Sequence, residues 1–211
     1  LPSKLKLVGD EAFNNCTALS KFYTPDSITS FGEGCFQNCT NLDSVNFPKN
    51  LTNIGSMAFQ NCSKLSYVYI PNYTSKIGSN AFDRCKWFVN LPDGLVYVGN
   101  VLYKYKGTMP ANYSLVVPNG ITGIADNAFE GFTTLTQVSI PASVQYIGNS
   151  AFENCKGLTT ISLPEGINKI RTRTFNNCKL LTTIQLPASI DTVEYAAFYN
   201  CSSISSLSLP Q

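Results

Sequence analysis

The chain has 211 residues, with 15 Lys and Arg against 13 Asp and Glu, and a formal net charge of +2. Because neither sign dominates, the sequence lacks the basic excess of a nucleic-acid-binding face, and we expect no nucleic-acid partner. The absence of histidine excludes Ser-His-Asp and Cys-His nucleophiles and histidine-based metal sites, and no apolar run approaches the ~20 residues that span a bilayer, so we expect no membrane insertion in this segment.

A unit of 23 residues recurs from the first coil onward. Its clearest marker is a phenylalanine, usually preceded by alanine, which occurs at Phe13, Phe36, Phe59, Phe82, Phe129, Phe152, Phe175 and Phe198. Every step is 23 residues except the step of 47 between Phe82 and Phe129. Repeats of this length predict a solenoid, in which each coil covers the core of its neighbour.

The unit from Leu135 to Cys155 shows which elements each coil predicts. Apolar residues alternate at Val138 and Ile140, which is typical of a strand with one buried face, and the following proline ends the strand. An Ile-Gly step then predicts a corner, and the Ala-Phe-x-x-Cys spacing predicts one or two tight helical turns. We therefore expect about nine such coils, with a parallel β-sheet on the concave face and short strands and helical turns opposite.

This unit resembles the repeat of the BspA-like (Treponema pallidum type) bacterial leucine-rich repeat proteins, Leu-x-x-Ile-x-Ile-Pro-x-x-Val-x-x-Ile-Gly-x-x-Ala-Phe-x-x-Cys. The resemblance covers almost the whole chain and implies a leucine-rich repeat solenoid. It also implies a secreted or cell-surface protein of a host-associated bacterium, with an adhesin-like role. No metal or other cofactor is implied, and the sequence has no C-x₂-C pair that would suggest zinc.

The repeat is interrupted at residues 86–117, which divides the chain into N-terminal repeats (1–85), a degenerate repeat with an insertion (86–117) and C-terminal repeats (118–211). Two β-rich runs around Gly99-Asn100 predict a β-hairpin. One face, expected to pack on the solenoid, carries Val96, Val98, Val101, Tyr103 and Tyr105. The other, expected to face solvent, carries Tyr97, Leu102, Lys104 and Lys106. The hairpin either bridges two half-arrays or takes part in binding, since irregular insertions often carry function.

Two further columns accompany the phenylalanines. Seven cysteines form one column, Cys16, Cys39, Cys62 and Cys85, then Cys155, Cys178 and Cys201, with 23-residue steps inside each group, and Cys35 occupies the alanine column. We interpret them as a ladder of buried thiols, because free cysteine is among the most buried residue types. The asparagine before most of these cysteines is expected to bond the backbone in the coil corner. Glycosylation of the four that form N-x-[ST] sequons is the alternative.

The outward strand positions suggest where a ligand binds. They are small and polar in the C-terminal half (Gln137, Thr160, Thr183, Ser206; Ser139, Ser162, Gln185, Ser208), whereas the N-terminal half carries Tyr23, Tyr67 and Tyr69. Tyrosine is enriched at interface hot spots. We therefore predict a ligand-binding patch of Tyr23, Tyr67 and Tyr69 that extends to Tyr97 and Lys104 of the hairpin. Ordinary exposed aromatics are the alternative interpretation.

These features favour a non-catalytic recognition module that binds host or microbial macromolecules, with a protein or glycan partner on the concave face or the hairpin. A structural spacer that presents another domain is the alternative, and an enzyme is the least favoured class. The repeat pattern stops in mid-register at both ends without a polar cap. We therefore expect a longer array, or self-association through the uncapped ends.

Overall fold

The computed structural model describes residues 3–207. The chain consists of two compact units, and the boundary between them lies within the predicted hairpin. Unit 1 comprises Leu1–Pro92 with Tyr97–Val101, and unit 2 comprises Asp93–Val96 with Leu102–Gln211. The described residues form about eight turns of ~23 residues with little helix, and the predicted leucine-rich repeat solenoid is confirmed.

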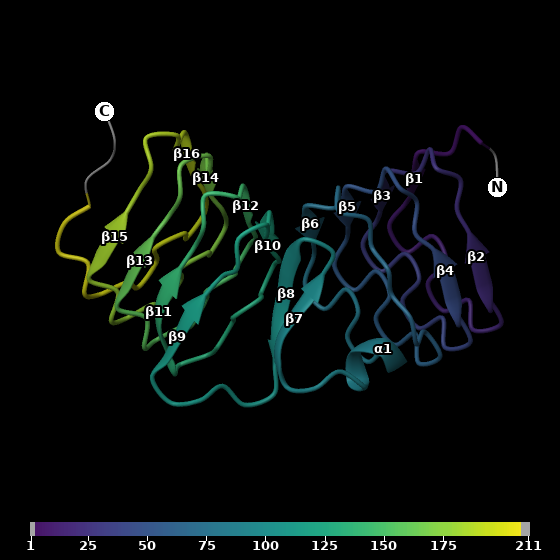
Figure 1. Cartoon of the computed structure of the whole chain (residues 1–211), viewed down its shortest axis with the longest axis horizontal. Coiled ribbons are helices and arrows are strands. Elements are labelled where there is room, and N and C mark those ends of the chain that lie inside the picture. The colour runs from purple at the N-terminus through teal and green to yellow at the C-terminus, as the bar shows by residue number, and fades with distance from the viewer. Residues whose placement is uncertain (1–2, 208–211) are drawn as a thin grey trace. The chain divides into compact units, whose positions relative to one another are not determined.

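Unit 1 carries a pair of parallel strands on one side of its coils and a row of shorter strands on another (Figure 1). The pair is β2 (Lys21–Tyr23) and β4 (Ser44–Asn46), with Lys21 opposite Ser44 and Tyr23 opposite Asn46. The row has the order β1-β3-β5-β6 and consists of β1 (Leu7–Val8), β3 (Ser30–Phe31), β5 (Asn53–Ile54) and β6 (Lys76–Ile77). Strands of neighbouring coils therefore pair residues that are 23 positions apart in the sequence.

The third coil of unit 1 differs from the expectation, because its segment around Val68 joins no strand ladder. The alternation nevertheless persists, with Tyr67 and Tyr69 exposed and Ile70 buried. The short helix α1 (Lys86–Val89) follows this coil, and the amide of Trp87 donates to the carbonyl of Leu65 at 2.8 Å. Here α1 occupies the place where the next regular coil would pair.

The predicted hairpin is present as β7 (Gly94–Val98) and β8 (Val101–Lys106). The five residues expected to pack inward are buried, but the prediction for Leu102 was wrong, since that side chain is 0% exposed. The reason is that β8 is an inner strand of the sheet with the order β12-β10-β8-β7. The carbonyl oxygen of Leu102 accepts a hydrogen bond of 3.0 Å from the backbone amide of Ala125. Tyr97, Lys104 and Lys106 are half-buried.

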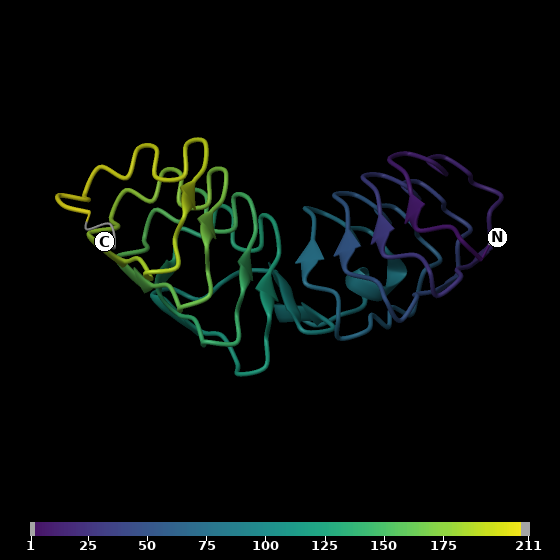
Figure 2. The ribbon, with the colours of Figure 1, turned by 90° about the horizontal axis from the view of Figure 1, so that it is seen from above.

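Unit 2 repeats the two-sided arrangement with longer ladders (Figures 1 and 2). Its main sheet has the order β15-β13-β11-β9 and consists of β9 (Tyr113–Val116), β11 (Leu135–Ser139), β13 (Thr160–Ser162) and β15 (Thr183–Gln185). The shorter strands are β10 (Gly123–Ile124), β12 (Tyr146–Ile147), β14 (Lys169–Ile170) and β16 (Thr192–Val193). Of the last predicted strand, Leu207 is exposed, and Ser208, Leu209 and Pro210 lie outside the described residues.

Stacked phenylalanine rings form the core of each unit. In unit 1 the ring centroids of Phe59 and Phe82 are 5.4 Å apart and the planes differ by 2°; in unit 2 the rings of Phe152 and Phe175 are 5.6 Å apart, also at 2°. All four side chains are 0% exposed. Like side chains of successive coils therefore pile into continuous columns, as the repeat predicts.

The turn side of the coils contains tight turns in place of the expected helical turns. Two positions per coil have left-handed backbone conformations, for example Ser150 (φ 53°) and Asn154 (φ 60°), which interrupt any helix. The amide of Asn154 donates to the carbonyl of Asn176 in the next coil at 2.8 Å, so these turns bond between coils. Helical geometry would direct the same donors along a single coil.

The asparagines of the column were expected to bond the backbone, but their side chains bond each other between coils. The side-chain amide of Asn61 donates to the side-chain oxygen of Asn38 at 2.7 Å, and Asn177 donates to Asn154 at 2.6 Å. Because asparagine tolerates the left-handed region better than most residues, the column combines a backbone requirement with a side-chain ladder between coils. The sequence alone indicated only a backbone bond.

The cysteine column is a ladder of free thiols, as predicted. Cys39, Cys62, Cys85, Cys155 and Cys178 are buried, whereas Cys16 is exposed and Cys201 half-buried. Each thiol from Cys39 onward lies 2.8–3.2 Å from the carbonyl oxygen of a phenylalanine 26 residues earlier. Burial raises the pKa of Cys39 to about 11 and that of Cys178 to about 12, which keeps both thiols protonated as hydrogen-bond donors.

Candidate recognition surfaces on the strand side

The tyrosine surface of unit 1 consists of Tyr23, Tyr67 and Tyr69, which are outward residues on the strand side of the coils. The central residue of β2, Phe22, is buried, so its neighbours Lys21 and Tyr23 point outward. Tyr23, Tyr67 and Tyr69 are 71%, 70% and 68% exposed. The outward direction of these predicted site residues thus follows from the two-residue alternation of the strand.

The tyrosine surface is arranged in two columns. Pairing puts Lys21 beside Ser44 and Tyr23 beside Asn46, and the repeat step continues these columns to Tyr67 and Tyr69. Neighbouring coils are spaced by about 4.8 Å, so Tyr23 and Tyr69 flank Asn46 at a separation of roughly 10 Å. Sequence reasoning missed Tyr73, which is 76% exposed in the turn after Pro71, because it lies outside the strand columns.

The two predicted hairpin residues fall in different units. Tyr97 belongs to the hairpin tip within unit 1, and this tip lies against the third coil. At Gly99 (φ 56°) a Cβ would come within 3.2 Å of the carbonyl oxygen of Ile70, so glycine permits the close approach. The tip therefore reaches the coil that carries Tyr69. Lys104 lies on β8 in unit 2 and is half-buried.

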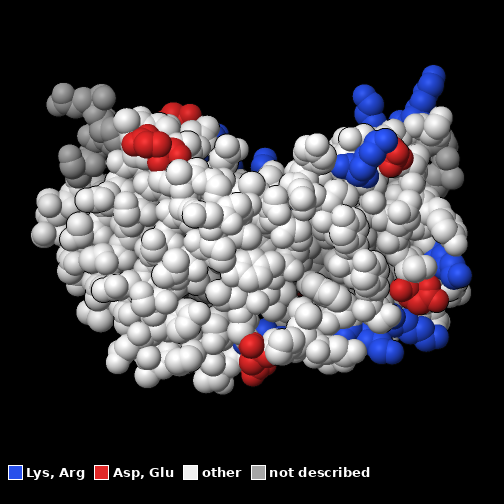
Figure 3. All heavy atoms as spheres, in the orientation of Figure 1, with Lys and Arg blue, Asp and Glu red and all other residues white. Residues whose placement is uncertain are grey.

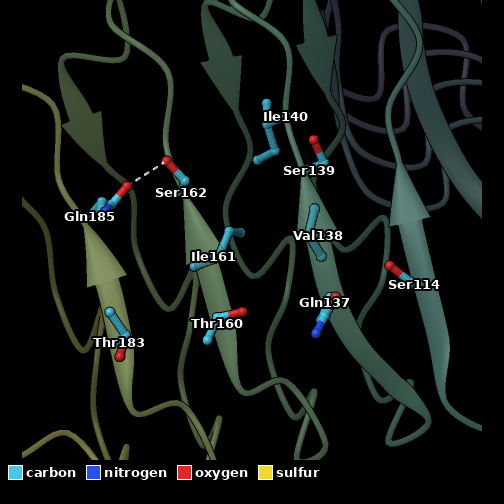
Figure 4. A pocket seen from close by; sticks show the side chains of 10 residues that line it. All are labelled: Ser114, Gln137, Val138, Ser139, Ile140, Thr160, Ile161, Ser162, Thr183 and Gln185. Atoms are coloured by element: carbon cyan, nitrogen blue, oxygen red, sulfur yellow. Dashed lines mark hydrogen bonds between the residues drawn. The ribbon is translucent and has the colours of Figure 1, made fainter.

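A hollow of about 520 Å³ lies on the strand side of unit 2 (Figure 4). It is lined by Ser114, Gln137, Val138, Ser139, Ile140, Thr160, Ile161, Ser162, Thr183 and Gln185. All of these side chains are uncharged, and no charged group covers β11, β13 and β15 in the space-filling view (Figure 3). The sequence indicated the small polar character of these positions, but it gave no sign that the surface is hollowed.

Adjacent threonines in this hollow's strands have different roles. The hydroxyl of Thr159 donates to the carbonyl of Thr136 at 3.1 Å, and Thr182 donates to Thr159 at 3.2 Å. Thr160 and Thr183, one residue further along, make no side-chain hydrogen bond to another described residue and point into the hollow. One threonine column therefore links coils, while the next presents its hydroxyls to solvent.

A polar cluster around Asp126 links coils on the turn side. The hydroxyl of Tyr146 and the amide of Asn149 donate to one carboxylate oxygen of Asp126 at 3.2 and 2.9 Å. Desolvation raises the pKa of both Asp126 and Tyr146. Because Asp126 connects two coils through these bonds, we interpret the cluster as structural. No grouping of three His, Cys, Asp or Glu side chains suited to a metal occurs between residues 3 and 207.

None of the helices in the part of the chain that the structure describes is long and apolar enough to cross a membrane. The similar solved structures are distant in sequence. A leucine-rich cell surface protein of Faecalibacterium prausnitzii is 18% identical, with 97% of this chain and 85% of that chain covered and a TM-score of 0.48. A leucine-rich repeat protein of Bacteroides ovatus is 20% identical (98% and 70% covered, TM-score 0.45), and one of T. pallidum is 23% identical (97% and 76% covered, TM-score 0.38).

No curated protein matches the sequence. The family described as BspA type leucine-rich repeat region matches residues 1–89 and 103–211 in six copies. The matched residues include the phenylalanine and cysteine columns, and the gap between them, residues 90–102, contains β7 and the hairpin turn but only the first two residues of β8. Solenoids of this kind generally act as binding scaffolds without catalytic activity. The chain belongs to the BspA type leucine-rich repeat family.

Proposed function

We propose that this chain is a non-catalytic recognition module, secreted or displayed at a cell surface, that binds a host or microbial macromolecule in the manner of an adhesin. The observation that carries the proposal is the tyrosine surface, on which Tyr23, Tyr67 and Tyr69 are each about two-thirds exposed or more. Tyrosine combines a large apolar ring with a polar hydroxyl and is enriched where proteins bind their partners.

The fold does not require aromatic residues at these positions. In the columns of Tyr67 and Tyr69, other coils carry Ser44 and Asn46, or Thr160 and Ser162, with the same outward orientation. The exposed rings also add nothing to the buried core. Their presence on three outward positions of unit 1 is therefore better explained by contact with a partner than by folding.

The proposed partner is a protein or a glycan. We assign the main contacts to Tyr67 and Tyr69, which stand on one coil, and further contacts to Tyr23. Tyr97 extends this site at the hairpin tip, and Lys104 is the proposed cationic contact of the hairpin. The secreted or cell-surface location is proposed from the family, whose members are typically exported.

The test is binding of the purified chain to an array of extracellular matrix proteins and glycans, followed by titration with the strongest partner. The variant Y67A/Y69A should weaken binding at least about tenfold, since hot-spot tyrosines contribute upwards of ~1 kcal/mol each. The matched control is T160A/T183A, which truncates two outward residues on the strand side of unit 2.

The outcomes separate the alternatives. Loss of binding in T160A/T183A with none in Y67A/Y69A would move the site to the hollow of unit 2 and contradict the tyrosine surface. Absence of any partner on the array would favour a spacer. Turnover of a substrate by the pure chain would contradict a non-catalytic role.

A further inference from the structure

A separate pocket lies on the turn side of the C-terminal coils. It has a volume of about 510 Å³ and is lined by Arg173, Asn176, Tyr195, Ala196 and Tyr199. We propose that this pocket binds an acidic saccharide, that is, a sugar ring that carries a carboxylate. The proposal does not depend on the tyrosine surface, because the pocket lies in unit 2 and on the turn side of its coils.

The repeat itself shows that the two tyrosines are not needed for folding. The column of Tyr195 is polar in every other regular coil, with Asp10, Glu33, Ser56, Ser79, Asp126, Asn149 and Thr172. The column of Tyr199 is also polar, with Asn14, Gln37, Gln60, Asp83, Glu130, Glu153 and Asn176. Tyr195 and Tyr199 are 72% and 70% exposed, so they contribute little to the core. Aromatic rings appear at these columns only where they line the pocket.

Arg173 supplies a cation beside these rings. Its guanidinium carbon lies 5.9 Å from the ring centroid of Tyr195, which leaves the edges of the guanidinium open to a ligand. It forms no ion pair with another residue in the described part of the chain, whereas the nearby Arg171 is paired with Glu194 at 3.8 Å. A guanidinium binds a carboxylate through two parallel hydrogen bonds, and this geometry suits an acidic sugar.

The remaining groups fit the rest of a sugar. The exposed faces of Tyr195 and Tyr199 offer apolar surface for the C–H face of the ring, and their hydroxyls offer polar contacts. The side-chain amide of Asn176 donates to Glu153 at 2.7 Å, which leaves its oxygen to accept a bond from a sugar hydroxyl. Because Glu153 stands on the Asn176 side, an acidic ligand is expected to direct its carboxylate toward Arg173.

Backbone hydrogen bonds hold the walls of the pocket in place. The amide of Arg173 donates to the carbonyl of Tyr195 at 3.0 Å, and the amide of Asn177 donates to the carbonyl of Tyr199 at 2.7 Å. A third bond, from the amide of Tyr199 to the carbonyl of Ala196 at 3.1 Å, closes the turn between the tyrosines. A site whose walls are already ordered loses less entropy when a ligand binds.

The test is a calorimetric titration of the intact chain with a hexuronate oligosaccharide, a neutral oligosaccharide of the same length and a short poly-glutamate peptide. We expect the hexuronate to bind at least tenfold more tightly than either comparator, and higher salt to weaken it. Equal binding of the neutral sugar, preference for the peptide, or no binding of the hexuronate would overturn the proposal.

Three variants of the pocket should fold, two of them with residues taken from the preceding coil. Y195T and Y199N install the residues found at Thr172 and Asn176, and R173Q removes the charge. Each should weaken hexuronate binding at least tenfold while the melting temperature stays unchanged. Y67A/Y69A is the matched control and should bind the hexuronate like the original chain. Unchanged affinity in all three pocket variants would contradict the assigned site.

Discussion

The thiol of Cys62 lies 3.2 Å from the carbonyl oxygen of Phe36, 26 residues earlier, and donates a hydrogen bond to it. The same thiol-to-carbonyl hydrogen bond recurs at five other cysteines of the column. Cysteine is small enough for the space beneath the phenylalanine stack and also carries a donor. The column therefore links each coil to the preceding one by side chain as well as by backbone.

Replacement of Cys62 by alanine should lower the free energy of unfolding by about 1–2 kcal/mol, because a buried hydrogen bond and a sulfur atom's packing are both lost. Urea denaturation monitored by circular dichroism would measure the change. C16A is the control, since Cys16 is exposed and its loss should change stability by less than about 0.5 kcal/mol. Equal effects of the two substitutions would show that the thiol ladder adds nothing to stability.

The stability of the chain should fall as the pH rises above about 9. Burial raises the pKa of Cys39 from 9.0 to about 11 and that of Cys178 to about 12, so the unfolded state loses these protons first. Because the folded state then binds more protons than the unfolded state, rising pH favours unfolding. Melting temperatures between pH 7 and 11 would test this prediction.

The matched control for the pH dependence is C39A/C178A, which removes two of the shifted thiols. Its melting temperature should be lower at pH 7 but should decline less steeply above pH 9. A decline as steep as that of the original chain would assign the alkaline sensitivity to other groups.

Substitutions of Asn154 should separate its two roles. Asn154 has φ 60° and accepts the bond from Asn177 at 2.6 Å. N154G loses the side-chain bond but keeps an easy left-handed conformation, whereas N154A loses both. We expect N154A to be less stable than N154G by about 1 kcal/mol in urea denaturation. If alanine were as stable as glycine, the left-handed backbone would cost little here.

Gly55 and Gly9 occupy the same column but should respond differently to alanine. A Cβ at Gly55 would lie 2.5 Å from the carbonyl carbon of Gly32, whereas a Cβ at Gly9 would have nothing within 4 Å. G55A should therefore push neighbouring coils apart and lower stability by about 2–3 kcal/mol or more. G9A should leave the melting temperature within error, and a marked drop in G9A would contradict the explanation by coil spacing.

The sequence predicted the features that follow from periodicity. The stacking of Phe59 on Phe82, the buried thiols and the outward direction of Tyr67 and Tyr69 all follow from a fixed repeat in which one face is apolar. The hairpin could also be predicted, because Gly99-Asn100 is a favoured two-residue turn between β-rich runs. Each of these inferences needed only neighbours in the chain or in the same column.

Features that depend on the arrangement of whole coils were missed. Leu102 looked solvent-facing in an isolated hairpin, and only the pairing of β8 with β10 buries it. The left-handed residues Met57 and Ala196 are of types that give no local signal of that conformation. By contrast, the pocket at Tyr195 and Tyr199 left a signal, since two aromatics interrupt otherwise polar columns.

The predicted binding residues Tyr23, Tyr67, Tyr69, Tyr97 and Lys104 illustrate a different limit. Alternation in a strand decides which side chains face outward, but exposure alone does not select a ligand. The choice among protein, glycan or no partner depends on complementarity with a second molecule. The repeat pattern contains no information about that molecule.

Hydrogen bonds between residues 23 positions apart restrict how this chain can change in length. Duplicating or losing a complete coil preserves every donor and acceptor, whereas deleting one residue inside a coil shifts every later partner on that turn. The 47-residue step between Phe82 and Phe129 contains one residue more than two units and spans the segment where the hairpin replaces a regular coil. The extra residue falls between β6, the last strand of one sheet, and β8, where Leu102 again bonds a partner 23 positions away, so it shifts no pairing between coils within either sheet. This segment can therefore change in length without displacing a ladder.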